Sequence, residues 1–402
     1  MIEDKLSGLH PTLESFIKLE RYLNDGSPSG FSEINTTSPG HRPSDPVPCF
    51  DLSLYSADQV NLHRAGSDSK IENQLYPVHP DMTASFEEMT GLKACHKAKA
   101  IPTSSPRTLY VDQPNDPLFV KLAYQRLIGR VTRRMTRRHV MSAIEISRCL
   151  KDAIDRRLLP PQIQIFHEYA GAYFDDDSDL TDWGFVERQA RVEAVQQFPL
   201  IPAFSLFATA HGSKIPLLHA IMERSTDLRN PECFFVSYIR PLLDLYFEII
   251  IVLGLQPEAH SQNVIYALGS NLIPAAVALR DMESVDKDLG IMDHFRMSPS
   301  FTELTYKTLR KSDYNYQIMH SFMFDFKLGE YLIRPLTDCW AKLAGERATA
   351  VIEGRIRGYS QDKMKRLPDD FFPKGVWFDY EPVVHEGSQI RQYRSNSAPR
   401  FR

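Results

Sequence analysis

The stretch EAHSQNVIYALGSNLIPAAVALRD, residues 258–281, contains two apolar runs separated by glycine, asparagine and proline. Short apolar runs on either side of such turn formers are typical of a β-hairpin. We expect Leu268 to face Ala275 across the turn, which places Asp281 opposite Gln262, at about 5 Å between Cβ atoms. The hairpin therefore predicts that polar residues at its two ends meet.

The residues that lead into this hairpin carry several metal-ligand side chains. Alternate residues of an extended chain share a face, so we expect Glu258, His260 and Gln262 on one side and Asn263 on the other. The carboxylates of Glu258 and Asp281 then converge, and carboxylate and amide oxygens suit Mg²⁺. An exposed hairpin edge with scattered polar residues is the alternative interpretation, with His260 as a hydrogen-bonded structural histidine.

A second hairpin is predicted from about Thr108 to Leu122, where TLYV and LFVKL flank the turn formers of DQPNDP. It would bring Arg107 and Lys121 close to the hydroxyl groups of Ser105 and Thr108. Cations and hydroxyls on a rigid sheet are suited to binding phosphate. The sequence therefore predicts a phosphate platform here.

A run of arginines follows this second hairpin. After Tyr124 the pattern becomes helical, and spacings of four, three and four residues place arginines on one face of a helix. The predicted stripe consists of Arg126, Arg130, Arg133 and Arg137. Such a stripe serves a nucleotide triphosphate, a polycarboxylate or a nucleic acid, and an ordinary solvated face is the further alternative.

The composition is that of an ordinary packed protein, with 402 residues of which 43% are hydrophobic and 24% charged. The formal net charge of −4 provides no general attraction for nucleic acid or anionic membranes. The five cysteines are widely spaced without a CxxC pair, which argues against a disulfide framework or zinc ribbon. No apolar run has the length of a signal peptide or a membrane span. We therefore expect a cytoplasmic protein.

The remaining chain is predicted to be mainly helical, with sheet concentrated near residues 100–122 and 263–281. Linker composition characterises residues 26–48. Helices are expected from Val140 to Leu159 and over residues 216–226, 233–254, 318–333 and 336–355. No P-loop, HExxH or GxGxxG motif occurs, which excludes the commonest nucleotide and zinc signatures. The acidic stretch that starts at Phe174 lacks the glycine and glutamate positions of a calcium-binding loop.

Several short motifs follow one another in a specific order. They are YPVHP from Tyr76, SPRT from Ser105, FVKL from Phe119, an arginine twelve residues after the lysine, EAHSQN from Glu258 and LRD from Leu279. Together they resemble the siderophore synthetases that work without a peptide synthetase, the aerobactin synthetase family, over about residues 70–290. The resemblance implies an α+β, cupped-hand fold in which a β-containing fingers domain and a mainly helical palm domain surround a central cleft. The corresponding division is a variable N-terminal segment over 1–70, fingers over 71–140 and palm over 141–402.

The resemblance also implies an ATP- and Mg²⁺-dependent ligase. It would activate citrate or a citrate-like acid as an acyl adenylate, with AMP and pyrophosphate as products, and join it to an amine or alcohol. The residues implied in nucleotide binding are Ser105, Arg107, Thr108, Lys121, Gln262 and Asn263. Those implied for the acid are Arg133 and His260, those for the metal are Glu258, Asn263 and Asp281, and the catalytic ones are Arg107, Lys121 and His260. No nucleic-acid or membrane partner is implied, and a homodimer is compatible.

The chain departs from the family pattern at three places. Family members carry a longer N-terminal domain with an H-P-x-H-P-type motif and a following lysine, whereas LHPTLESFIK from Leu9 supplies a single His-Pro. Gly129 and Asp81 stand where a threonine and an aromatic residue are common. A diverged relative that binds nucleotide or carboxylate without catalysis is therefore the second interpretation, and a nucleic-acid binder that uses the arginine stripe is the third.

Overall fold

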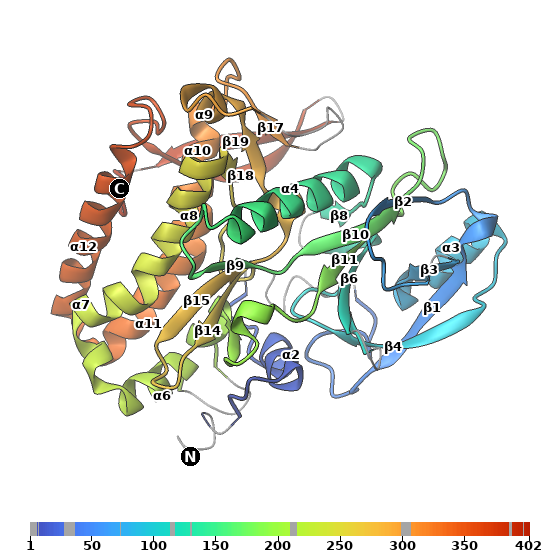
Figure 1. The fold of residues 1–402 in the computed structure, drawn as a ribbon, viewed down its shortest axis with the longest axis horizontal. Helices are drawn as coiled ribbons and strands as arrows, with labels where there is room; N and C mark the ends of the chain where they lie inside the picture. Colours follow the sequence, from blue (N-terminus) through green and yellow to red (C-terminus); the bar gives the residue numbers. More distant parts are fainter. Residues whose placement is uncertain are drawn as a thin grey trace.

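The computed structural model describes residues 6, 8–27, 37–72, 74–112, 117–128, 131–209, 215–298, 307–385, 388–396 and 398–402. A sheet-bearing half and a helical half lie side by side, and a long helix, α4, runs along their junction (Figure 1). The fold is α+β, as the sequence predicted. Of the described helices, none is both long and apolar enough to cross a membrane.

The sheet-bearing half is built on an eight-stranded antiparallel sheet with the order β2-β10-β11-β6-β5-β4-β1-β3. Its strands are β1 (Phe50–Ser56), β2 (His63–Gly66), β3 (Leu75–Val78), β4 (His96–Pro102), β5 (Thr108–Val111), β6 (Leu118–Leu122), β10 (Glu168–Tyr173) and β11 (Phe185–Gln189). The central strands β5 and β6 are buried throughout. The predicted hairpin of 108–122 is thus confirmed, while its turn residues 113–116 lie outside the described residues.

An aromatic core supports this sheet beneath helix α3 (Thr83–Thr90). Phe86 contacts Tyr55 and Tyr76 with ring centroids 4.7 and 5.2 Å apart, and Trp183 lies 5.4 Å from Phe86. These rings are buried, and aromatic burial of this extent dominates the energetics of a core. They hold β1 and β3 against the strands that carry the predicted phosphate platform.

The arginine stripe is not helical, and this prediction is wrong. Residues 124–133 form two short strands, β7 (Tyr124–Ile128) and β8 (Val131–Arg133), and α4 begins only at Arg137 and ends at Asp155. The local reason is a capping box: Thr136 and His139 satisfy the free backbone N–H groups at the helix start. Arg126 and Arg133 therefore lie on strands, Arg137 lies in the first turn of α4, and Arg130 lies outside the described residues.

The second predicted hairpin, β14 (Val264–Leu268) and β15 (Pro274–Leu279), is confirmed. It is the centre of a four-stranded sheet in which β12 (Leu200–Pro202) and β9 (Ile163–Ile165) flank it. The pairing of Val264 with Leu279 follows the predicted register, but a bulge next to the turn pairs Leu268 with Pro274 instead of Ala275. Proline has no backbone N–H for the ladder, and bulges accommodate it at such positions.

The helical half packs around one large hydrophobic core. Its elements are α5 (Ala203–Phe207), α6 (Leu217–Arg224), α7 (Pro231–Phe234), a π-helical segment Phe235–Ile239, α8 (Arg240–Leu253), α10 (Tyr316–Ser321), a π-helical segment Phe322–Ile333, α11 (Arg334–Ala344) and α12 (Glu346–Met364). The four helices predicted in this half are present. The one expected over 336–355 is interrupted at Gly345, whose φ of +95° ends α11.

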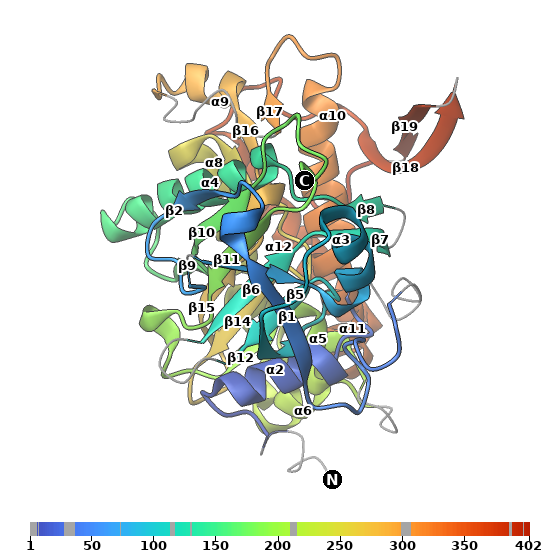
Figure 2. The ribbon, with the colours of Figure 1, turned by 90° about the vertical axis from the view of Figure 1, so that its right-hand side faces the viewer.

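Two smaller sheets complete the molecule. One contains β13 (Leu255–Gln256), β16 (Asp286–Asp288) and β17 (Thr308–Leu309), next to helix α9 (Leu289–His294). The other is the hairpin of β18 (Val376–His385) and β19 (Ser388–Asn396), which projects from the body in Figure 2. The sequence did not predict β18 and β19.

The N-terminal segment packs against both halves. Helix α2 (Leu13–Tyr22) starts at an N-cap, Thr12, and its buried Arg21 donates to the carbonyls of Pro43, Asp45, Val47 and Pro48. Within the predicted linker, residues 37–48 contain no helix or strand, and residues 28–36 lie outside the described residues. The eight-stranded sheet draws strands from all three segments of the predicted domain division, which stays a prediction.

Candidate functional site

The two hairpins meet through a lysine. Lys121 lies on β6 opposite Thr108 on β5, and its side chain is only 3% exposed. Its Nζ contacts Oδ1 of Asp281 and lies 2.7 Å from Oε2 of Glu283. The structure therefore brings the predicted phosphate platform and the end of the predicted acidic hairpin to one place.

Further charged groups, buried or partly buried, surround this contact and form what we call the ion-pair cluster: Arg107, Lys121, Glu168, Arg188, Asp281 and Glu283. Arg188 Nη2 lies 2.6 Å from Oε1 of Glu168 and 3.6 Å from Oδ1 of Asp281, and Arg107 Nη2 lies 3.7 Å from Oε2 of Glu283. Burial opposes ionisation of Asp281, but Lys121, Arg188 and Arg107 outweigh it and hold its pKa well below the usual range. The cluster is thus a balanced set of charged groups.

The backbone conformation of Asp281 directs its carboxylate into this cluster. Its φ is +75°, in the left-handed region that aspartate tolerates better than most residues. The bond from Arg280 N–H to the Asn263 carbonyl, 2.9 Å, continues the hairpin register to its last pair. Beyond that pair Asp281 turns out of the strand, so it does not extend the ladder opposite Gln262 as predicted.

A polar bridge connects the loop before β5 to the same hairpin. Nε2 of Gln262 and Nη2 of Arg280 each donate to Oγ of Ser104 at 3.3 Å. Glu20, from helix α2, accepts a 2.7 Å bond from the same hydroxyl and lies 2.8 Å from Nη1 of Arg280. Gln262 is therefore held against the 103–108 loop, within which the Thr108 N–H donates to the Ser105 carbonyl at 3.1 Å.

Residues 257–263 form successive turns rather than an extended strand, so the predicted row of Glu258, His260 and Gln262 on one face is wrong. The N–H groups of Ala259 and His260 donate to the carbonyls two residues earlier, and those of Asn263 and Val264 donate to His260. Turn-forming Pro257, Ser261 and Asn263 explain the local preference. The structure does bring these side chains to the end of the hairpin.

A hydrogen bond links Asn263 to Glu258 within this turn. Nδ2 of Asn263 donates to the Glu258 carbonyl at 3.1 Å, and the Glu258 carboxylate lies 2.6 Å from Nζ of Lys327. Burial opposes ionisation of Glu258, but Lys327 and His260 lower its pKa strongly. Glu258 and Asp281 are thus each paired to a different lysine, and both act electrostatically on His260.

His260 is neutral at pH 7. Its Nδ1 accepts the Gln262 N–H at 3.2 Å, which places the ring hydrogen on Nε2. Burial lowers its pKa to about 4, against the opposing effect of Glu258. Arg133 lies on β8 with Nη2 3.5 Å from the Ile128 carbonyl. Burial lowers the pKa of Arg107, Glu283 opposes this, and the charge of Arg133 adds to the lowering.

Sequence reasoning missed several members of this region. Glu283 lies two residues after Asp281 in LRDMES and could have been found from that proximity. Glu168, Arg188 and Lys327 carry no local signal, because each comes from a distant strand or helix. His139 also approaches Glu283, at 3.8 Å from Nε2 to Oε1, and burial lowers its pKa.

The donor set suits Mg²⁺ without enclosing it. Asp281 and Glu258 offer carboxylate oxygens. The amide of Asn263 donates through Nδ2 to the Glu258 carbonyl, and its Oδ1 accepts no hydrogen bond from the described residues. Among the described residues no group of three or more His, Cys, Asp or Glu side chains is placed to hold a metal ion. Mg²⁺ takes few protein ligands and completes its shell with water and phosphate, so these oxygens fit it.

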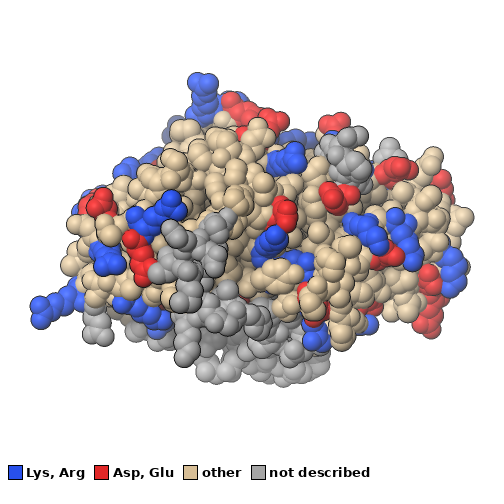
Figure 3. Space-filling view, turned by 90° about the horizontal axis from the view of Figure 1, so that it is seen from below, with Lys and Arg blue, Asp and Glu red and all other residues tan. Residues whose placement is uncertain are grey.

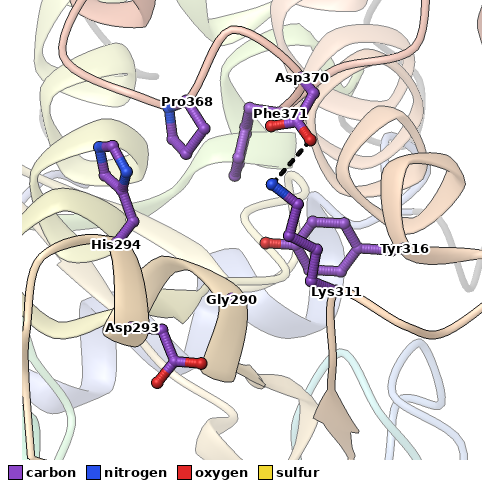
Figure 4. A pocket seen from close by; sticks show the side chains of 8 residues that line it. All are labelled: Gly290, Asp293, His294, Lys311, Tyr316, Pro368, Asp370 and Phe371. Atoms are coloured by element: carbon purple, nitrogen blue, oxygen red, sulfur yellow. Dashed lines mark ion pairs between the residues drawn. The ribbon is translucent and has the colours of Figure 1, made fainter.

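Two pockets lie elsewhere on the described part of the chain. One, of about 300 Å³, is lined by Gly290, Asp293, His294, Lys311, Tyr316, Pro368, Asp370 and Phe371, with an ion pair of 2.8 Å between Lys311 and Asp370 (Figure 4). The other, of about 590 Å³, lies beside α7 and includes Glu232, Cys233 and Asn271. Neither is lined by a predicted site residue.

The surface in Figure 3 gives no support to the nucleic-acid interpretation. On that face lysine and arginine alternate with aspartate and glutamate instead of forming a continuous basic patch. A polyanionic backbone needs clustered cations along its path. The loss of the predicted helical stripe removes the observation on which that interpretation depended.

Comparisons with known proteins agree with the geometry. Residues 73–208 match the model of the IucA / IucC family. No curated protein matches the chain. The ATP-bound aerobactin synthetase IucA from a hypervirulent pathotype of Klebsiella pneumoniae is similar with a TM-score of 0.67 at 15% identity, over 92% of this chain and 74% of that one.

Two further solved structures are similar at low identity. The petrobactin biosynthesis protein AsbB from Bacillus anthracis str. Sterne has a TM-score of 0.67 at 16% identity, over 90% of this chain and 70% of that one. The aerobactin synthetase IucC from the same Klebsiella pneumoniae pathotype has a TM-score of 0.60 at 14% identity, over 82% of this chain and 66% of that one. These comparisons confirm the cupped-hand fold and the resemblance seen in the motifs, and the match to the IucA / IucC family model covers residues 73–208.

Proposed function

We propose that this protein is an ATP- and Mg²⁺-dependent ligase of siderophore biosynthesis that activates citrate or a citrate-like acid as an acyl adenylate. The observation that supports it is the meeting of Arg107 and Lys121 with Asp281 and Glu283 between two hairpins. Its solved neighbours include an ATP-bound aerobactin synthetase, which favours the same nucleotide here. We also propose a cytoplasmic location and the fingers and palm division predicted from the sequence.

The first requirement of this chemistry is to bring two anions together. A carboxylate that attacks the α-phosphorus of ATP meets strong repulsion, which fixed cations must neutralise. Arg107 and Lys121 would contact the triphosphate beside Ser105, Thr108, Gln262 and Asn263. Because both cations are paired with carboxylates, phosphate oxygens would take over part of these contacts as the nucleotide binds.

The carboxylates of the same site would then serve the metal. Glu258, Asn263 and Asp281 would hold Mg²⁺, which supplies charge neutralisation for the phosphates when bound. The carboxyl groups of Glu258 and Asp281 would be ionised before the metal binds, since neighbouring cations lower their pKa values despite burial. When Lys121 leaves Asp281 for a phosphate oxygen, the Asp281 carboxylate would become available to the metal.

The acid would be held by His260 and Arg133. His260 is neutral with its hydrogen on Nε2, so it donates one hydrogen bond to a carboxylate oxygen without adding charge. Arg133 would supply the charge that pairs with a second carboxylate group. The acyl adenylate then meets the nucleophile, where orientation and exclusion of water are the protein's contribution.

A non-catalytic relative that binds nucleotide or carboxylate is the second candidate. One observation favours it: each cation of the ion-pair cluster already has a carboxylate partner. Such a balanced cluster is stable without a ligand and gives the triphosphate less net attraction than unpaired cations would.

The deciding experiment is the exchange of pyrophosphate into ATP, measured with a panel of tricarboxylates. The ligase requires exchange that depends on the added acid, and Arg107→Ala and His260→Ala should each reduce it at least tenfold. Arg355→Ala, which removes an exposed arginine paired with Glu232, is the matched control and should leave it unchanged. ATP binding without exchange would support the non-catalytic relative, and unchanged exchange in both site variants would refute the residue assignment.

A further inference from the structure

A second polar group lies two residues before Glu258, on the small sheet of β13, β16 and β17. Gln256 on β13 pairs directly with Asp286 on β16, and both are buried, with 0% and 5% of their surface exposed. Residues directly opposite on antiparallel strands place their side chains on the same face, about 5 Å apart at Cβ. We call Gln256 and Asp286 the acceptor pair.

The neighbour on the same face, Asp288, is completely satisfied. Its Oδ2 accepts from Nε2 of Gln256 at 2.6 Å and from Nε2 of His320 at 2.8 Å. Its Oδ1 accepts from the Tyr316 hydroxyl at 2.8 Å and from the Ile291 N–H at 3.0 Å. Because Nε2 of Gln256 is committed to Asp288, the orientation of this amide is fixed and its Oε1 points away from Asp288.

The acceptor pair itself has no donor. Within the described part of the chain, Oε1 of Gln256 and Oδ2 of Asp286 are shielded from solvent and receive no hydrogen bond. Asp286 also forms no ion pair with a described cation, although Lys307 and His320 act on it at longer range. Buried acceptors without donors are costly, and adjacent ones call for a shared donor.

The charges around the pair indicate what kind of donor fits. Burial raises the pKa of Asp286 to about 6, Lys307 opposes this rise, and the nearby carboxylates of Glu258 and Asp288 add to it. At pH 7 the carboxyl group is therefore mainly ionised and attracts a cation. An ammonium group supplies both the positive charge and several N–H donors, whereas a neutral hydroxyl supplies one donor and no charge.

We propose that Gln256 and Asp286 form a subsite for an ammonium group carried by the substrate that accepts the activated acid, separate from the neutral amine or hydroxyl group that attacks it. The inference rests on the proposed function for the identity of the ligand, and Gln256 precedes the proposed metal ligand Glu258 by two residues. The ammonium group takes the place of the missing donor, with one N–H directed to each orphan oxygen.

The test compares butane-1,4-diamine with butane-1,4-diol as probes of the full-length protein, by calorimetry and thermal unfolding. The diamine should bind and raise Tm, and the diol should do neither. Asp286→Asn should weaken diamine binding at least tenfold. Without ligand its Tm should equal or exceed that of the wild type, because the substitution removes an unpaired buried charge and no hydrogen bond. Asp293→Asn, at an exposed residue of α9, is the control and should change neither quantity.

Two results would overturn the subsite: diamine binding by Asp286→Asn equal to the wild type, or a lower Tm of the unliganded variant, which would reveal a structural partner. The pyrophosphate exchange reaction needs no amine, so it separates the two proposals. Exchange retained with diamine binding insensitive to Asp286→Asn removes the subsite alone. Diamine binding that depends on Asp286 in a protein without exchange removes the ligase alone and leaves the subsite standing.

Discussion

The ion-pair cluster and the acceptor pair are two buried polar regions with opposite properties. In the cluster, Lys121 and Arg188 lie against carboxylates, so each buried charge has a partner of opposite sign. In the acceptor pair, Asp286 and Gln256 have oxygen atoms without a donor among the described residues. The cations Lys121 and Arg188 are as buried as the acceptor pair, whereas the side chains of Asp281 and Glu283 are 25% and 12% exposed.

The comparison teaches that partners of opposite charge can reverse the direction in which burial shifts the pKa of a carboxyl group. Cations overcome burial at Asp281 and lower its pKa, whereas burial prevails at Asp286 and raises its pKa. A buried charge with a partner of opposite sign is compensated within the chain, and removal of that partner is costly. A charge that is left unbalanced costs stability until a ligand arrives.

The largest expected effect comes from removing one partner of the cluster. Arg188→Met should leave Glu168 and Asp281 buried without this cation and lower the free energy of unfolding by about 3–5 kcal/mol. Thermal and urea unfolding measure it. Arg355→Met, at an exposed ion pair, is the control. Equal losses in both variants would contradict the distinction between balanced burial and surface pairing.

A double-mutant cycle at Lys121 and Asp281 sharpens the same point. Lys121→Met alone leaves the carboxylates of Asp281 and Glu283 without this lysine. Adding Asp281→Asn removes one of these charges, so it should lower the free energy of unfolding less in Lys121→Met than in the wild type. We expect a coupling free energy of about 1–3 kcal/mol from urea unfolding of the four proteins. Strictly additive losses would mean that the lysine and the carboxylate do not stabilise each other.

The stability of the folded protein should depend on pH through Asp286 of the acceptor pair. Because the pKa of Asp286 is raised to about 6 in the folded state, from 3.8, the folded protein binds more protons and loses stability as pH rises through this window. Asp286→Asn removes this loss, so its Tm relative to the wild type should rise from pH 4 to pH 6 and then level off. The full difference is about 3 kcal/mol, from about 1.4 kcal/mol for each unit of pKa shift. A constant offset would mean that another group titrates.

The titration of Asp286 depends on the charges that face it, which are Lys307, Glu258, His320 and Asp288. The control is therefore a substitution of one carboxyl group that is not among these four residues or Asp286 itself. Asp313→Asn changes a partly exposed carboxyl group that accepts the Arg310 N–H. Its Tm difference from the wild type should not follow the same pH profile.

The smallest expected effect comes from an exposed ion pair with short geometry. Nζ of Lys151 lies 2.5 Å from Asp155 one helical turn later, and both side chains are about half exposed, at 43% and 54%. Solvent and salt screen such pairs, so Lys151→Ala should change the free energy of unfolding by less than about 0.5 kcal/mol. A loss comparable with that of Arg188→Met would show that distance alone decides the strength of these pairs.

The two hairpins were predictable because their signals are local. Alternating or continuous apolar runs around Gly269 and Pro274, and around the turn after Val111, restrict the backbone within a few residues. The arginines from Arg126 to Arg137 misled for the same reason. Their spacing fits a helix, but it does not exclude two short strands followed by a capped helix, and only packing chooses between them.

The sequence by itself determined the α+β class, both hairpins with most of one register, the principal helices and the motifs that resemble the IucA / IucC family. Tertiary structure alone decided that Lys121 reaches Asp281 and Glu283, that Arg188 and Glu168 complete the cluster, and that Gln256 and Asp286 are left without a donor. The reason is physical: hairpins and helices arise from interactions between near neighbours, whereas the state of a buried charge depends on which distant side chains fold against it.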